Sequence, residues 1–141
     1  MNRWREFHPA KAMFVAGMCG LLLLWIFDPA QSGIFPPCPF RYLTGWYCPG
    51  CGSLRALHQL LHGNIEAAWA MNPLALVFLP FIAYGLLSEV VKYWRGRGLP
   101  QPVLSGASIQ ALCAVIILFG IARNLPLHPL NLLAPGAMLH P

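Results

Sequence analysis

The stretch C-P-F-R-Y-L-T-G-W-Y-C-P-G-C-G-S-L-R, residues 38–55, carries three of the five cysteines in the chain. Its C-P-G-C turn at residues 48–51 is followed by Gly52 and then Ser53, a residue type that favours the start of a helix. Proline and glycine favour tight turns, and this segment holds both in and around the C-P-G-C sequence. We therefore predict a cysteine-bearing hairpin over residues 38–71, around which the rest of the chain is arranged.

The composition indicates that lipid is the solvent of this chain. Of its 141 residues, 57% are hydrophobic and 9% are charged, whereas ordinary soluble domains are about 45–50% apolar and about 25% charged. The net charge of +5 comes from basic residues that flank apolar stretches, which is typical of membrane proteins. We therefore predict one all-α membrane domain over residues 1–141, with the lipid bilayer as its surroundings and no nucleic-acid partner.

Three apolar stretches predict three transmembrane helices, at about residues 12–27, 73–91 and 103–122. The first is shorter than the ~20 residues that cross a bilayer, so Lys11 would have to extend toward the interface. Its exit lacks a clean cleavage site for a signal peptide, and we expect it to be retained. The tail, residues 124–141, is apolar but interrupted by prolines, and is not expected to span the membrane.

The second predicted span has a well-marked start. Asn72 is a good N-cap, and Pro73 suits the first helical position because its missing N–H costs nothing there. Pro80 should kink the helix, since it removes one backbone hydrogen bond. Asn72 and Pro73 are therefore predicted to be structural residues.

The basic residues predict the orientation of these spans. Most lie before the first span or between the second and third, and few lie in the long first loop or in the tail. Because lysine and arginine concentrate on the cytoplasmic side, we expect a multi-pass inner-membrane protein with a cytoplasmic N-terminus and an extracytoplasmic cysteine loop.

Two short helices are predicted inside the hairpin. Ser53 would cap a helix over Leu54–His62 that ends at Gly63, and a second helix would cover Ile65–Met71. The first is amphipathic, with Arg55 and His58 on its polar face, and such a helix lies in the membrane interface or packs on the spans.

The order of these motifs resembles a known family. The chain has C-P, then T-G, C-P-x-C-G, R-A, G-N and N-P, at residues 38–39, 44–45, 48–52, 55–56, 63–64 and 72–73. This order is similar to that of small bacterial membrane proteins catalogued as domain of unknown function 2752. The chain departs from that family at Leu54, where threonine is usual. The resemblance implies a bacterial integral membrane protein and names no activity.

The cysteines are compatible with a metal site. Cys38, Cys48 and Cys51 offer three thiolates, and zinc takes four ligands. His58 is the candidate for the fourth, although it lies about 10 Å beyond Cys51 along a helix that rises ~1.5 Å per residue.

The same cysteines are compatible with redox chemistry or with a purely structural role. As a thiol-disulfide oxidoreductase, the chain would use Cys48 and Cys51 at a helix start, where a thiolate is favoured, with Cys38 as exchange partner. The odd number of cysteines in the hairpin argues against an enzyme. We therefore favour a structural or accessory protein that assembles with another membrane protein through a cysteine-stapled or metal-binding hairpin. Arg55 is expected to support the turn by satisfying its carbonyl groups.

Overall fold

The computed structural model describes residues 9–101 and 105–137, and the described residues form helices without any strand. Six α-helices and one 3-10 helix follow in order: α1 (Pro9–Ile26), α2 (Pro39–Thr44), α3 (Ser53–Leu61), α4 (Ile65–Met71), α5 (Pro73–Arg95), α6 (Gly106–Ala122) and η1 (Leu130–Leu133). The predicted all-α fold is confirmed. The basic N-terminal arm, residues 1–8, lies outside the described residues, as does the expected start of the third span at Val103.

Among the residues that the structure describes, one helix is long and apolar enough to cross a membrane. It is the Pro73–Lys92 part of α5, with a mean hydropathy of 2.1. The apolar parts of α1 and α6, Phe14–Ile26 and Gly106–Ala122, are shorter, so the three predicted spans are not confirmed. α6 begins only at Gly106 because the side chain of Ser105 accepts a hydrogen bond from the Ser108 N–H and caps the helix there.

The hairpin follows the predicted pattern with two differences. Its second helix, Ile65–Met71, and the start of α5 at Pro73 lie where the sequence places them, and the side chain of Asn72 accepts from the Ala75 N–H as an N-cap should. α3 starts one residue early, with Gly52 rather than Ser53 at the N-cap. The short helix α2 was not predicted; it begins at Pro39, a residue type suited to the first helical position.

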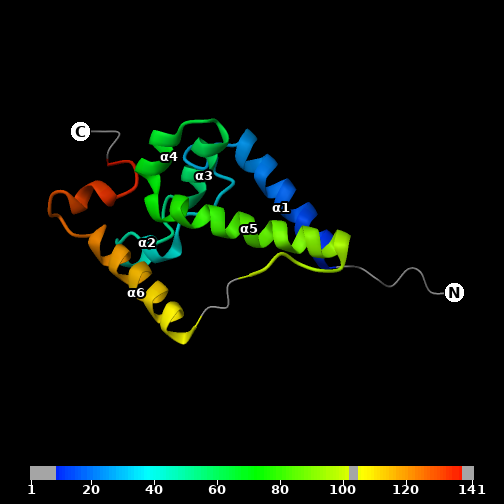
Figure 1. The fold of residues 1–141 in the computed structure, drawn as a ribbon. Helices are drawn as coiled ribbons and strands as arrows, with labels where there is room; N and C mark the ends of the chain where they lie inside the picture. Colours follow the sequence, from blue (N-terminus) through cyan, green and yellow to red (C-terminus); the bar gives the residue numbers. More distant parts are fainter. Residues whose placement is uncertain (1–8, 102–104, 138–141) are drawn as a thin grey trace.

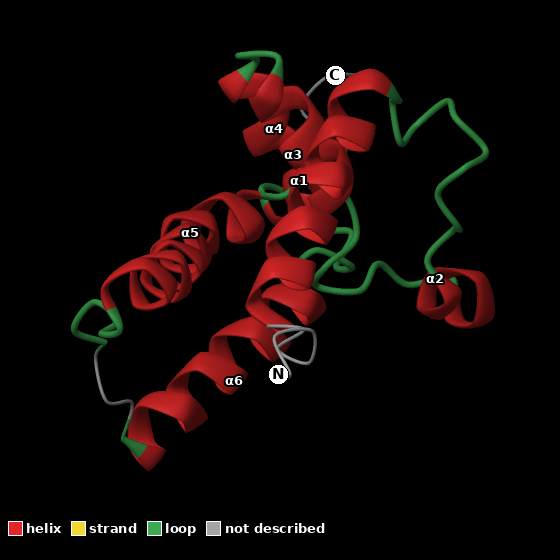
Figure 2. Cartoon of the chain, turned by 90° about the vertical axis from the view of Figure 1, so that its right-hand side faces the viewer, coloured by secondary structure: helices red, strands yellow, loops and turns green. Residues whose placement is uncertain are grey.

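The hairpin lies where the three long helices meet. α3 packs on α4 and also contacts α1 and α5, while η1 contacts α4 and α6. Figures 1 and 2 show that α5 leads away from this region and that α6 returns to it. The end of α1, the start of α5 and the end of α6 therefore lie beside the hairpin, and the end of α5 and the start of α6 lie away from it.

The buried core of the described residues is small. Its apolar members are Leu24, Cys51, Ala56, Ala68 and Ala70, and all of these except Leu24 lie in α3, α4 or the cysteine turn. By contrast, large apolar side chains on the long helices are exposed, among them Leu22, Phe81 and Leu118. Apolar surface on this scale is found where a protein meets a membrane or a partner.

Candidate metal centre

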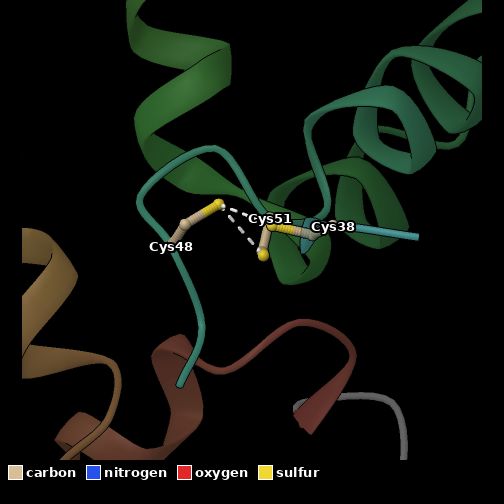
Figure 3. A group of neighbouring side chains, drawn as sticks. All are labelled: Cys38, Cys48 and Cys51. Atoms are coloured by element: carbon tan, nitrogen blue, oxygen red, sulfur yellow. Dashed lines mark hydrogen bonds between the residues drawn. The ribbon is translucent and has the colours of Figure 1, made fainter. Parts of the chain in front are cut away.

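Three thiols from two separate segments of the hairpin converge. Cys38 precedes α2 as its N-cap, and Cys48 and Cys51 lie in the turn before α3. The Cys48 sulfur lies 3.4 Å from that of Cys38 and 3.1 Å from that of Cys51, and all three sulfurs lie within 4.8 Å of one another (Figure 3). The structure therefore brings together the three cysteines that the sequence singles out.

The turn that presents Cys48 and Cys51 depends on a glycine. The N–H of Cys51 donates to the Cys48 carbonyl at 3.0 Å, and that of Ser53 donates to the Gly50 carbonyl at 3.1 Å. Gly52 then takes a φ of +86°, and a Cβ atom there would lie 2.6 Å from the carbonyl oxygen of Met71. Only glycine fits this position, because both the backbone conformation and the close approach of the chain before α5 exclude a side chain.

Asn72 ties the start of α5 to the cysteine turn. Its side chain is 1% exposed. Besides accepting from the Ala75 N–H, it lies within hydrogen-bond distance of the Pro49 carbonyl at 3.0 Å, the Cys51 carbonyl at 3.3 Å and the Ser53 hydroxyl at 2.9 Å. The predicted cap thus also holds the backbone of the site.

Two residues at the end of α6 hold the turn from the other side. Nη1 of Arg123 donates to the carbonyls of Cys48 at 2.9 Å and Pro49 at 3.2 Å. The Asn124 side chain accepts from the Tyr47 N–H at 2.8 Å and donates to the Tyr47 carbonyl at 2.9 Å. Neither residue was singled out from the sequence. The adjacent R-N pair at the end of an apolar helix was the available signal, since both side chains satisfy exposed carbonyl groups well.

A close contact accompanies this clamp. A Cβ atom on Gly120 would lie 2.9 Å from the ring of Pro49. The absence of a side chain at Gly120 therefore lets the last turn of α6 lie directly against the cysteine turn.

The Arg123 guanidinium is buried and only partly satisfied. The residue is 1% exposed, and within the described part of the chain its Nε and Nη2 atoms have no hydrogen-bond partner. Burial lowers its pKa, while Cys51, Cys48 and Tyr47 act in the opposite direction as potential anions. The positive charge of Arg123 thus lies beside the thiols.

The thiols differ in acidity. Burial raises the pKa of Cys51 to about 12, and its neighbours Cys48 and Cys38 add to the increase. The backbone N–H of Arg41 instead lowers the pKa of Cys38, against the opposing effect of desolvation. The sequence predicts that the helix start at α3 favours a thiolate, but at Cys51 the shielding of the thiol from water opposes this effect and raises its pKa.

The spacing of the sulfurs suits a metal ion. Tetrahedral zinc with Zn–S bonds of about 2.3 Å places sulfurs about 3.8 Å apart, and the separations of 3.4 and 3.1 Å from Cys48 to its two neighbours lie a few tenths of an ångström below that distance. A disulfide requires about 2.05 Å. The three side chains therefore fit three corners of a zinc site.

His58 and Arg55 do not join this cluster. The ring of His58 lies against the Leu24 carbonyl of α1 and beside His62, so it connects α3 to α1 rather than offering the predicted fourth ligand. Arg55 is exposed. In the described chain the side-chain hydrogen bonds to the carbonyls of the turn come from Arg123 and Asn72, and none comes from Arg55.

A cavity of about 660 Å³ opens on the cysteine cluster. It lies between residues 29–37 and the cysteine turn, and its lining includes the three cysteines together with Arg41 and Arg55. Arg41 stacks on Tyr47, with its Cζ atom 3.7 Å from the ring centre. The cysteine cluster is therefore accessible from one side.

Comparisons with known proteins place the hairpin in a family. No curated protein and no solved structure matches the chain. A family model does match, over residues 38–86, a segment that contains the whole hairpin and the first part of α5 but not Arg123. Residues 38–86 match the model of the family described as "Protein of unknown function (DUF2752)", which confirms the resemblance predicted from the C-P-x-C-G and N-P motifs.

Proposed function

We propose that this chain is a small integral membrane protein whose hairpin, residues 38–71, is held together by a metal ion bound to three thiolates. The observation that carries the proposal is the convergence of three sulfurs, from Cys38, Cys48 and Cys51, within 4.8 Å. Zinc fits best, because it prefers thiolate ligands and a tetrahedral arrangement. Joining Cys38 to the turn would fix a hairpin whose own core is too small to do so.

The burial of Arg123 supports a charged metal site over a neutral disulfide. A buried guanidinium is costly unless an anion lies near it, and in the described residues the potential anions that act on Arg123 are Cys51, Cys48 and Tyr47. Neutral thiols or a disulfide would leave that charge uncompensated. Three thiolates and Zn²⁺ carry one net negative charge, which Arg123 matches.

The arrangement of the long helices supports a membrane location with three crossings, in the bacterial inner membrane. The end of α1, the start of α5 and the end of α6 all lie beside the hairpin (Figure 1), as alternating crossings require. Lys92 and Arg95 lie in the last turn of α5, on the opposite side. By the positive-inside rule that side is cytoplasmic and the hairpin is extracytoplasmic. The exposed apolar sides of the helices would face lipid or another membrane protein.

A second candidate function is thiol-disulfide exchange. Its support is the 3.1 Å separation of the Cys48 and Cys51 sulfurs, which a small movement could shorten to a bond. In that case Cys38 would be the exchange partner, and the protein would contain a disulfide rather than a metal.

Metal analysis of the detergent-purified protein tests the proposal. We expect equimolar zinc, and thiols at Cys38, Cys48 and Cys51 that react with a thiol reagent only after a chelator is added. Cys38→Ser, Cys48→Ser and Cys51→Ser should each lose the metal and lower the abundance of the protein. Cys19→Ser and Cys113→Ser, whose cysteines are exposed on α1 and α6, are the matched controls. Metal-free protein with a single reactive thiol in the hairpin would identify a disulfide instead.

A further inference from the structure

The cavity beside the cysteines is lined by cationic and neutral residues. None of its lining residues is acidic, whereas Arg41 and Arg55 both line it. The nearest acidic residue along the chain, Asp28, is occupied in its own turn, where its carboxylate accepts from the Ala30 N–H at 2.8 Å. The cavity is therefore positively charged at the point where it meets the thiols.

The two arginines differ in how they are held. Arg41 is fixed by stacking on Tyr47, which leaves the edge of its guanidinium free to donate hydrogen bonds. Arg55 lies one helical turn after Cys51, and in the part of the chain that the structure describes it makes no side-chain hydrogen bond to the turn. Both guanidinium groups are planar and present paired N–H donors, which suit the oxygen atoms of an anion.

The proposed metal site takes a further ligand besides the cysteines. Three cysteines supply three of the four ligands that zinc takes, and no histidine or carboxylate joins them among the described residues. The cavity reaches all three cysteines, so an outside ligand can approach the metal from that side.

We propose that this cavity binds a phosphate group, with one phosphate oxygen as the fourth metal ligand and the others accepting hydrogen bonds from Arg41 and Arg55. This inference rests on the proposed metal site. A volume of about 660 Å³ lies within the range of roughly 300–1,000 Å³ for small-molecule sites. Phe35, Pro36 and Leu54 add apolar wall, which suits a phosphate attached to an organic or lipid group.

Cobalt provides the test, because Co²⁺ in a thiolate site has a visible spectrum that responds to its fourth ligand. The protein is loaded with Co²⁺ in a phosphate-free detergent, freed of excess metal and titrated with inorganic phosphate, with chloride at equal ionic strength as the control. We expect a saturable spectral change with phosphate and none with chloride.

Charge-neutral variants locate the binding site. Arg41→Gln and Arg55→Gln should each keep the cobalt spectrum without phosphate and weaken phosphate binding by about tenfold or more, the effect expected for a lost charge-assisted hydrogen bond. Arg95→Gln removes the same charge at the far end of α5 and should bind phosphate as the parent protein does.

The outcomes separate this inference from the proposed function. Cobalt binding with no response to phosphate, or an equal response in Arg55→Gln and Arg95→Gln, overturns the phosphate site and leaves the metal site standing. Failure to bind cobalt overturns both.

Bilayers distinguish the two sources of phosphate. Cobalt-loaded protein in discs of phosphatidylglycerol is compared with protein in detergent. If the lipid headgroup is the ligand, the discs alone produce the spectral change and added phosphate produces no more. A change that still requires added phosphate identifies a free phosphate compound.

Discussion

Two arginines near the cysteine turn have different roles, and position along the chain does not reveal which is which. Arg55 is close to the cysteines in sequence but is exposed. Arg123 is distant in sequence, yet it is buried and bonded to the Cys48 and Pro49 carbonyls. The expectation that a guanidinium supports the turn describes a real contact, but Arg123 provides it. Sequence reasoning could not find it, because the contact depends on how α6 returns to the hairpin.

Replacing each arginine by lysine tests this assignment. Arg123→Lys should lower the free energy of unfolding by roughly 1–3 kcal/mol, because lysine keeps the charge but cannot reproduce the planar set of donors to two buried carbonyls. Arg55→Lys should change it little, since exposed substitutions usually have small effects. Thermal melts in detergent compare the two, and a larger loss in Arg55→Lys would contradict the assignment.

Gly52 offers a second test with a close control. Gly52→Ala and Gly63→Ala both force alanine into a left-handed conformation, at φ +86° and +80°, which costs about 1–2 kcal/mol. Only at Gly52 would the new Cβ also meet a backbone carbonyl, that of Met71 at 2.6 Å. Gly52→Ala should therefore destabilise far more and lower metal content. Equal melting temperatures would show that the end of α4 does not approach the turn so closely.

The raised pKa of Cys51 predicts a loss of stability in alkali for the metal-free protein. The fold favours the neutral thiol of Cys51, and this preference adds to the free energy of unfolding. The added stability is complete below the ordinary pKa of 9.0 and is lost as the pH rises toward the raised pKa of about 12. The melting temperature of chelator-treated protein should fall over this range, and Cys51→Ala should flatten the fall. Cys113→Ala is the control. If the melting temperature of Cys51→Ala falls with pH as steeply as that of the control, the titrating group lies elsewhere.

At the scale of elements, local signals were sufficient for the hairpin. The N-P pair at residues 72–73 predicts the start of α5, and Gly63 correctly separates α3 from α4, because capping and turn residues act on their immediate neighbours. Long-range roles were not accessible in the same way. Ser53 was expected to cap α3, but its hydroxyl instead accepts from Asn72, and His58 contacts α1 instead of the thiols.

Asn72 illustrates the difference between a local cap and a cap with tertiary contacts. Ser105→Ala removes an exposed cap of α6, which should cost about 0.5–2 kcal/mol. Asn72→Ala removes the cap of α5 and also the donors to the Pro49 and Cys51 carbonyls, so its cost should exceed that of Ser105→Ala and be accompanied by loss of metal. Comparable melting temperatures for the two variants would mean that the contacts to the turn contribute little.

At the scale of the whole molecule, the hairpin lies at one end of the three long helices, and the end of α5 and the start of α6 lie away from it (Figure 2). Composition predicted an all-α membrane protein, because the chain has too few charged residues for an ordinary soluble domain. It could not predict how α6 returns to the hairpin, since a uniformly apolar helix such as α6 has no polar face to show which side packs on protein.

Reporter fusions test the orientation of this arrangement. A reporter active only outside the cytoplasm should be active when fused after His62 and inactive when fused after Arg97, because the basic residues near Arg97 favour the cytoplasmic side. A cytoplasmic reporter should give the opposite pattern at the same positions. Activity reversed at both sites would place the cysteines in the reducing compartment.

The bond from Arg123 to the Cys48 carbonyl joins residues 75 positions apart, and this separation is also a delay during synthesis. At about 5–20 residues per second, the ribosome adds Arg123 roughly 4–15 s after Cys48. During that interval the thiols have neither their clamp nor their buried counter-charge. If the hairpin has already crossed to an oxidising compartment, premature disulfide formation competes with metal capture, and the outcome depends on how quickly the last helix is inserted.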